Sequence, residues 1–288
     1  GGVTIIEFDD GSAVCLRRTP ALVSELVASS VATHLGIPIA QTRLVAPGSW
    51  EHKEIIKAET SCDFGETGGL VMAASHNPHV MIGVVDFVPG VRLDAAKQHF
   101  DEGPPSTQFF KQLGELQALD MLINNMDRLP LPLWRNPRGN FGNMMVPTES
   151  SGGKHVVGID QQVFVIQDER GMQSYLAGVE QLVQQLFAGD VVSEEDESSK
   201  FRPRALQQSL KDCFQLRLGV SLDEASTTAA LKGLREQILN IAGCYTSGSL
   251  RATTSAASDG VRHQVSKSNP HLLQSALKEA QSCTDFVL

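Results

Sequence analysis

The sequence predicts an α+β fold with two lobes, a β-rich N-terminal lobe over residues 1–89 and a mostly helical C-terminal lobe over residues 90–245. Three observations support this division. Short β-branched runs dominate the first part of the chain, the composition changes after Pro89-Gly90, and apolar residues then recur with a helical period. The chain has 288 residues and an apolar content of 41%, which is enough to bury two separate cores.

The N-terminal lobe is predicted to open with a β-hairpin. Residues 3–8 and 13–17 are β-rich, and Asp9-Asp10-Gly11-Ser12 between them is a strong turn signal. Thr19-Pro20 predicts the start of a helix, which has an apolar stripe and ends at Gly36. Further strands are expected over 39–45, 54–58, 69–74 and 80–87.

The C-terminal lobe is predicted to be helical around a short pair of strands. A helix is expected over 107–125, because its apolar residues recur about every 3.6 positions. A loop rich in Pro and Asn follows over 127–142, and short strands are expected near 143–147 and 155–159. Further helices are expected over 172–188, 204–217 and 223–242.

Residues 246–288 are predicted to form a flexible tail. Residues 246–262 are rich in Ser, Thr, Ala and Gly, a composition that is typical of linkers. Residues 269–281 have an apolar stripe and predict one short amphipathic helix. At the other end, Gly1-Gly2-Val3 lacks an initiator Met, so we expect a piece of a longer protein.

Three polar residues of the C-terminal lobe predict a chemistry. Asp127 follows the expected helix, Asn143 follows a glycine-rich turn, and Asp160 follows a short apolar strand. Phosphoryl transfer from ATP requires a carboxylate that accepts the proton of the substrate hydroxyl, and an amide oxygen and a second carboxylate that hold Mg²⁺. Each residue has a structural alternative: Asp127 could pair with Arg128, Asn143 could serve a turn, and Asp160 could cap one. Together they predict a kinase, with Asp127 as catalytic base and Asn143 and Asp160 as magnesium ligands.

Arg17 and Glu25 are candidates for holding the nucleotide. In protein kinases a strand lysine contacts the phosphates, and a glutamate on the next helix holds that lysine. Val14-Cys15-Leu16-Arg17 occupies the strand position, and Glu25 lies on the following helix, away from its apolar stripe. A guanidinium keeps the charge and can bind phosphate with two nitrogens, although it is bulkier than an ammonium. The alternative for Glu25 is a residue that faces solvent.

Bulk composition limits the classes of partner. A net charge of -9 gives no support to a nucleic-acid partner. No apolar run approaches the roughly 18–20 residues that a membrane span requires. The five cysteines are odd in number and form no CxxC pair, which favours a reduced cytoplasmic setting over a zinc site or a disulfide framework.

The loop around Asp127 resembles the catalytic loop of the actin-fragmin kinase family. The similar residues are Asp127-Arg128-Leu-Pro, Trp134-x-Asn136 and Gly139-Asn140-x-x-Asn143-Met. Members of this family are atypical protein kinases, with a two-lobed fold related to those of eukaryotic protein kinases and phosphoinositide kinases. The resemblance extends over roughly residues 1–245 and implies a two-lobed protein-kinase-like fold.

The resemblance also implies a nucleotide site and a substrate class. Val85-Asp86-Phe87-Val88-Pro89-Gly90 resembles the inter-lobe hinge, so the adenine of ATP is expected against the backbone of Val85, Asp86, Phe87 and Val88. Mg²⁺ is the expected metal. The implied activity is phosphorylation of Ser or Thr in a protein substrate, with actin or an actin-binding complex as the family substrate.

Three departures from ordinary kinases keep two other functions open. Arg17 replaces the lysine, Gly1-Gly2 is all that represents the phosphate-covering glycine loop, and Gln161-Gln162 follows Asp160 in place of Phe-Gly. The first two leave catalysis by this fragment open, and a pseudokinase scaffold that binds nucleotide is therefore one alternative. A phosphoinositide or small-molecule kinase is the other, because the atypical kinase fold serves both classes.

Overall fold

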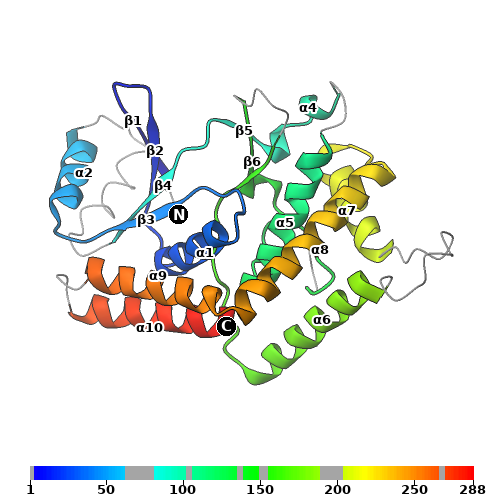
Figure 1. Ribbon diagram of the computed structural model, residues 1–288. Helices are drawn as coiled ribbons and strands as arrows, with labels where there is room; N and C mark the ends of the chain where they lie inside the picture. Colours follow the sequence, from blue (N-terminus) through cyan, green and yellow to red (C-terminus); the bar gives the residue numbers. More distant parts are fainter. Residues whose placement is uncertain are drawn as a thin grey trace.

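The computed structural model describes residues 3–61, 81–101, 106–134, 139–148, 155–188, 204–265 and 270–288. The molecule has the predicted two-lobed α+β architecture, with the strands β1 to β4 in one lobe and the long helices α5 to α8 in the other (Figure 1). The predicted strand over 69–74 and the Gly1-Gly2 pair lie outside the described residues.

A four-stranded antiparallel sheet with the order β1-β2-β4-β3 forms the N-terminal lobe. The predicted hairpin is confirmed, because β1 pairs with β2 and Gly11 adopts a left-handed conformation in the turn between them. On one face of the sheet, Leu16 packs with buried residues of β3 and β4. Side chains alternate between the faces of a strand, so Arg17 projects from the opposite face. The strands are β1 (Val3–Glu7), β2 (Ala13–Arg17), β3 (Thr42–Val45) and β4 (Ile82–Asp86).

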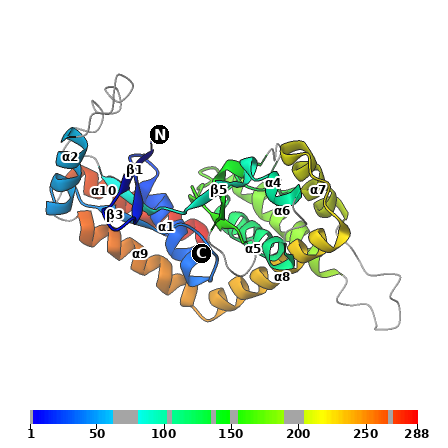
Figure 2. The same ribbon diagram turned by 90° about the horizontal axis from the view of Figure 1, so that it is seen from above.

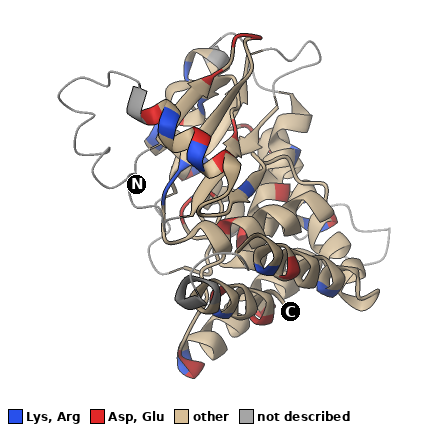
Figure 3. Cartoon of the chain, turned by 90° about the vertical axis from the view of Figure 1, so that its left-hand side faces the viewer, with Lys and Arg blue, Asp and Glu red and all other residues tan. Residues whose placement is uncertain are grey.

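Residues 54–58 form part of the helix α2 (Trp50–Ser61), so the prediction of a strand there is wrong. The apolar pair Ile55-Ile56 suggested a strand, but the Ser49 hydroxyl caps the helix by accepting the N–H of His52 at 3.1 Å. Both isoleucines pack against the core of the sheet while Glu and Lys residues alternate around them. Figure 3 shows this mixture of both charges along α2.

The helix α1 (Leu22–His34) is the main helix of the N-terminal lobe, and it begins two residues beyond the predicted Thr19-Pro20 start. Its Ncap residue is Ala21, and the Thr19 hydroxyl accepts the N–H of Ala21 instead of capping the helix. The helix ends before Gly36, as predicted, and that glycine has a φ of 70°. Since the consecutive residues Val23, Ser24 and Glu25 are all buried, α1 is covered on several sides.

The C-terminal lobe combines a small sheet with two closely crossing helices. The three-stranded antiparallel sheet has the order β5-β6-β7, and it begins directly after the connection over residues 87–89. The predicted helices and strands of this lobe are confirmed to within a few residues. Its elements are β5 (Gly90–Arg92), η1 (Leu93–Ala95), α4 (Gln98–Asp101), α5 (Thr107–Ile123), η2 (Phe141–Asn143), β6 (Met144–Pro147), β7 (Val157–Gly158), α6 (Glu169–Phe187), α7 (Arg204–Leu218) and α8 (Glu224–Thr246).

The prediction of a flexible linker over 246–262 is wrong, whereas the amphipathic helix predicted over 269–281 is confirmed as part of a longer helix. This part of the chain forms the helices α9 (Ser249–Val265) and α10 (Pro270–Val287), which pack on each other and on α1. From above, α8 and α9 follow one another from the C-terminal lobe to the N-terminal lobe (Figure 2). Ala favours helices, and a Thr hydroxyl can donate a hydrogen bond to a carbonyl of the preceding turn. The hydroxyl of Thr254 donates in this way to the carbonyl of Leu250 at 3.2 Å. A composition typical of linkers therefore builds a helix once tertiary packing covers one face.

Gly114 on α5 predicts a measurable effect of the close crossing between α5 and α8. A Cβ atom at Gly114 would lie 1.9 Å from the carbonyl oxygen of Ala230 on α8. Gly114→Ala should therefore lower the free energy of unfolding by about 1–3 kcal/mol. Gly243→Ala on α8 is the matched control, because nothing lies within 4 Å of its Cβ position, and it should raise stability by roughly 0.5–1 kcal/mol. Urea unfolding measures both, and a neutral Gly114→Ala would contradict the close crossing.

Candidate active site

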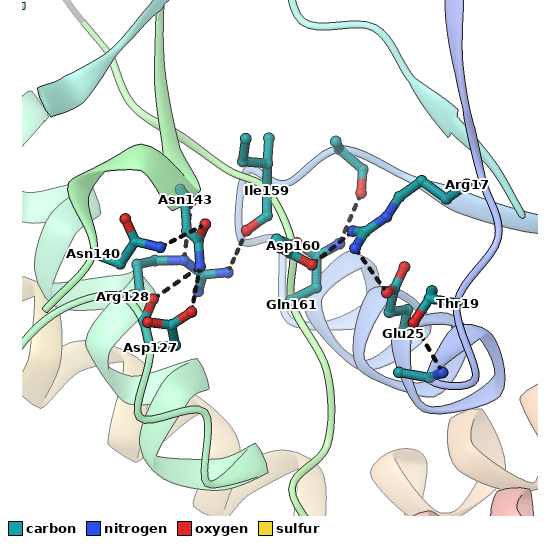
Figure 4. Close-up of polar contacts among 12 residues, drawn as sticks. Arg17, Thr19, Glu25, Asp127, Arg128, Asn140, Asn143, Ile159, Asp160 and Gln161 are labelled. Carbon is teal, nitrogen blue, oxygen red and sulfur yellow. Dashed lines mark hydrogen bonds and ion pairs between the residues drawn. The ribbon is translucent and has the colours of Figure 1, made fainter. Parts of the chain in front are cut away.

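Arg17, Glu25 and Asp160 form an ion-pair cluster between the two lobes (Figure 4). Nη2 of Arg17 lies 3.3 Å from Oε1 of Glu25, and Nη1 of Arg17 lies 2.6 Å from Oδ1 of Asp160. Arg17 comes from the end of β2, Glu25 from the first turn of α1, and Asp160 from the segment after β7. The predicted pairing of the strand arginine with the helix glutamate is thus present, and the contact with Asp160 adds a partner from the C-terminal lobe.

Glu25 is buried, so the alternative in which it faces solvent is wrong. Its side chain is 2% exposed, and no described residue makes a well-aligned hydrogen bond to its Oε1 atom. Burial raises the pKa of Glu25 to about 7. The positive charge of Arg17 lowers this pKa in part, and the negative charge of Asp160 raises it further.

Asp127 and Asn143 form a second cluster on the C-terminal lobe. The side-chain amide of Asn143 donates from Nδ2 to the backbone oxygen of Asp127 at 2.9 Å and to Oδ2 of Asp127 at 3.1 Å. Asp127 is exposed, whereas Asn143 is buried at the end of η2. The amide therefore orients a carboxylate that is open to solvent on its other side.

Arg128 lies between the segments that carry these two clusters. It pairs with Asp120, so the alternative in which it pairs with Asp127 is wrong. Its guanidinium is fully buried and lies 2.6 Å from Oδ1 of Asp120 on α5. It also donates to the backbone oxygens of Ile159 at 3.1 Å and of Asn143 at 3.4 Å. Together with the hydrogen bond from Ile159 N to Asn143 O at 3.0 Å, these contacts fix the two proposed metal ligands on neighbouring segments.

Asp120 is the buried partner that holds Arg128 in place, and the sequence analysis missed it. It is fully buried, and Nδ2 of Asn125 donates to its Oδ1 at 2.9 Å. Burial raises its pKa to about 6, although Arg128 and the hydrogen bond from Asn125 act in the opposite direction. The signal for it was an aspartate on the apolar stripe of α5, next to Leu119.

Asp160 has an uncommon backbone conformation. Its φ is 57°, in the left-handed region that Asp adopts more readily than most residues with a side chain. Its side chain is 43% exposed, so the carboxylate stays accessible beside Arg17. Backbone outliers of this kind concentrate at functional sites, because the surrounding structure has to hold them in place. The next residue, Gln161, contributes by donating from Nε2 to the backbone oxygen of Ala40 at 2.9 Å.

The predicted hinge residues lie where the chain passes from the first sheet to the second. Val85 is buried in β4 opposite Cys15 and Thr42. Asp86 is tied to Gln41 of the N-terminal lobe by a backbone hydrogen bond of 3.0 Å and a side-chain hydrogen bond of 3.1 Å. Phe87 is 37% exposed and Val88 is partly buried in the connection to β5. The side chain of Asp86 therefore holds the start of the hinge segment against Gln41 of the N-terminal lobe.

Comparisons with known proteins identify the family of this chain. The family described as "Actin-fragmin kinase, catalytic" matches residues 1–235, which include the N-terminal lobe, most of the C-terminal lobe and every candidate site residue. The chain belongs to this family. A protein of Dictyostelium discoideum named "Putative actin-fragmin kinase" is 23% identical over 225 residues, which cover 73% of this chain and 51% of that protein. The chain thus spans about half the length of this relative.

The solved structures that match include the Helicobacter pylori proinflammatory kinase CtkA. It has a TM-score of 0.32 and 11% identity, over 88% of this chain and 94% of that chain. The family match to the present chain ends at residue 235, within α8. The helices α9 and α10 therefore lie beyond the part that the family match covers.

Removing the Arg128 guanidinium should strongly destabilise the fold. Arg128→Met leaves the buried Asp120 carboxylate without its cation, which typically costs about 3–5 kcal/mol. Arg92→Met is the control: Arg92 is exposed and pairs with Asp94 at 3.0 Å, so its loss should cost about 0–1 kcal/mol. Combining Arg128→Met with Asp120→Asn should restore part of the stability. Urea unfolding of all variants tests this, and strictly additive losses would argue against the coupling.

The raised pKa of Glu25 predicts a pH-dependent stability. Glu25 holds its proton more tightly in the folded chain, so its contribution to stability is fully present below about pH 4.5 and is lost as the pH rises through about 7. Relative to Glu25→Gln, the wild type should therefore lose stability between about pH 4.5 and 7. Glu180→Gln, at an exposed position of α6, controls for the removal of a charge. Unfolding free energies across this range measure the effect, and a difference independent of pH would refute the assignment.

Proposed function

We propose that this chain is the catalytic domain of an ATP- and Mg²⁺-dependent protein serine/threonine kinase. One observation carries the proposal: Asp127, Asn143 and Asp160 are held at adjoining positions by Arg128, and Asp160 faces the pair of Arg17 and Glu25 from the other lobe. A carboxylate for the acceptor hydroxyl, two oxygen ligands for a cation and a charge for the phosphates are the groups that phosphoryl transfer requires.

Arg17 is the proposed phosphate-binding residue. Glu25 orients its guanidinium, which can bind phosphate oxygens with two nitrogens. In the proposed arrangement, the backbone of Val85, Asp86, Phe87 and Val88 binds the adenine. The position of these residues at the connection between the two sheets supports this assignment.

Asn143 and Asp160 fit a magnesium ion by the chemistry of their donor atoms. An amide oxygen and a carboxylate are hard oxygen ligands, and Mg²⁺ in such sites usually takes one or two carboxylates together with substrate phosphates and water. The ion would supply charge neutralisation at the phosphates. The exposed fraction of Asp160, 43%, leaves its carboxylate accessible for this purpose.

Asp127 is the proposed catalytic base. Its carboxylate is exposed and is oriented by the amide of Asn143, so it can accept the proton of a Ser or Thr hydroxyl.

Actin or an actin-binding complex is the proposed protein substrate, on the strength of the family match. The described cysteines Cys15, Cys213, Cys244 and Cys283 form no disulfide, which supports a cytoplasmic setting. No described helix is long and apolar enough to cross a membrane.

A transfer assay on the full-length protein tests this function. Radiolabelled ATP is supplied with actin, a generic protein or phosphoinositide vesicles, and protein phosphorylation that requires Mg²⁺ is the expected result. Labelling of lipid alone would identify a lipid kinase. Nucleotide binding without transfer to any substrate would identify a pseudokinase scaffold, which the replacement of lysine by Arg17 motivates.

Asp127→Asn separates catalysis from nucleotide binding. The substitution preserves shape, and Asp127 contacts the acceptor hydroxyl in the proposed mechanism, so the affinity for ATP should stay unchanged. Transfer should fall by about 10²–10⁴-fold, the usual contribution of a positioned acid or base. Asp259→Asn, on the exposed side of α9, is the control and should leave both quantities unchanged. An active Asp127→Asn, or one that no longer folds, would contradict the assignment.

A further inference from the structure

Asn140 belongs to the family-like motif but has no role in the mechanism above. Its backbone is fixed on both sides: its N–H donates to the backbone oxygen of Arg128 at 3.0 Å, and its backbone oxygen accepts the N–H of Asn143 at 3.0 Å. Its side chain makes two different contacts. Oδ1 accepts the N–H of Gly142 at 3.1 Å. Nδ2 donates to Oδ1 of Asn143 at 3.2 Å, the contact drawn in Figure 4.

These contacts determine which way both side-chain amides face. The backbone N–H of Gly142 can only donate, so it requires Oδ1 of Asn140 and turns Nδ2 of that residue toward Asn143. At the other end, the carboxylate and the carbonyl of Asp127 accept hydrogen bonds, so they require Nδ2 of Asn143. The contacts with Asn140 and with Asp127 therefore favour the same orientation of the Asn143 amide.

We infer that Asn140 is a positioning residue that keeps the amide oxygen of Asn143 available to a divalent cation, an inference that rests on the proposed function. An amide oxygen has two lone pairs, so Oδ1 of Asn143 can accept from Asn140 and bind a cation at the same time. Without the donor from Asn140, only the two hydrogen bonds to Asp127 hold the Asn143 amide, so turning its NH₂ group toward the cation costs less free energy. Outer contacts of this kind orient metal ligands and affect metal affinity.

Two substitutions separate positioning from helix capping. Asn140→Ser retains an oxygen that can cap the N–H of Gly142 but cannot reach Asn143, whereas Asn140→Ala removes both contacts. In the full-length protein, the Mg²⁺ concentration needed for half-maximal binding of a fluorescent ATP analogue is the main readout. Asn140→Ser should raise this concentration by about 10–100-fold while the melting temperature stays that of the wild type. Asn140→Ala should raise it equally and also lower the melting temperature.

Two further variants make each outcome decisive. Asp223→Ala removes the N-cap of α8, where Oδ1 accepts the N–H of Ser226 at 2.8 Å, and should lower the melting temperature without changing the Mg²⁺ requirement. Asn143→Ala should raise the requirement directly. If Asn143→Ala raises it and Asn140→Ser does not, Asn140 is only a cap and this inference alone fails. If binding by the wild type does not depend on Mg²⁺, the inference fails together with the proposed metal site.

Discussion

The buried guanidinium of Arg128 is the interaction on which the site depends. A cation with no exposed surface needs partners for its N–H groups, and Arg128 obtains them from Asp120 and from the backbone oxygens of Asn143 and Ile159. These partners come from α5, from the end of η2 and from the segment after β7. Satisfying one buried charge thereby brings together the parts of the chain that carry the proposed base and metal ligands. Such a pair contributes little net stability over apolar packing, but it specifies one arrangement of the loop.

The position of α1 decides whether the N-terminal lobe can complete the site. The carbonyl of its C-cap residue, Leu35, is held from the other lobe, because Gln237 and Asn240 on α8 both donate to this oxygen, at 3.2 and 3.3 Å. Near its start, the Ser24 hydroxyl donates to the backbone oxygen of Val163 at 2.9 Å, in the segment that follows Asp160. The helices α9 and α10 cover another side of α1. The distance between Glu25 and the C-terminal lobe is therefore determined by packing along the whole helix.

Arginine in place of lysine at position 17 has a geometric consequence. Its two Nη atoms reach Asp160 and Glu25 at the same time, at 2.6 and 3.3 Å, so one side chain connects the two lobes. A planar fork can make both contacts in one orientation, whereas a lysine ammonium is a compact point charge. Since burial raises the pKa of Glu25 to about 7, the cluster is also the part of the site whose charge responds to pH near neutrality. The substitution thus changes how the lobes are joined as well as how phosphate would be bound.

The sequence by itself determined the features that depend on local periodicity and turn chemistry. These are the hairpin at Gly11, the helix α5 and the two lobes. They also include the places of Asp127, Asn143 and Asp160 after a helix, a turn and a strand. It did not determine the structure of 54–58 or of 246–262, because short apolar runs and small polar residues are compatible with several local structures until other parts of the chain cover them. Nor could it place Arg128, whose partners Asp120 and Ile159 lie 8 and 31 positions away. Only the tertiary structure decided which charges are buried together, because the need to satisfy a buried charge arises only when distant segments exclude water from it.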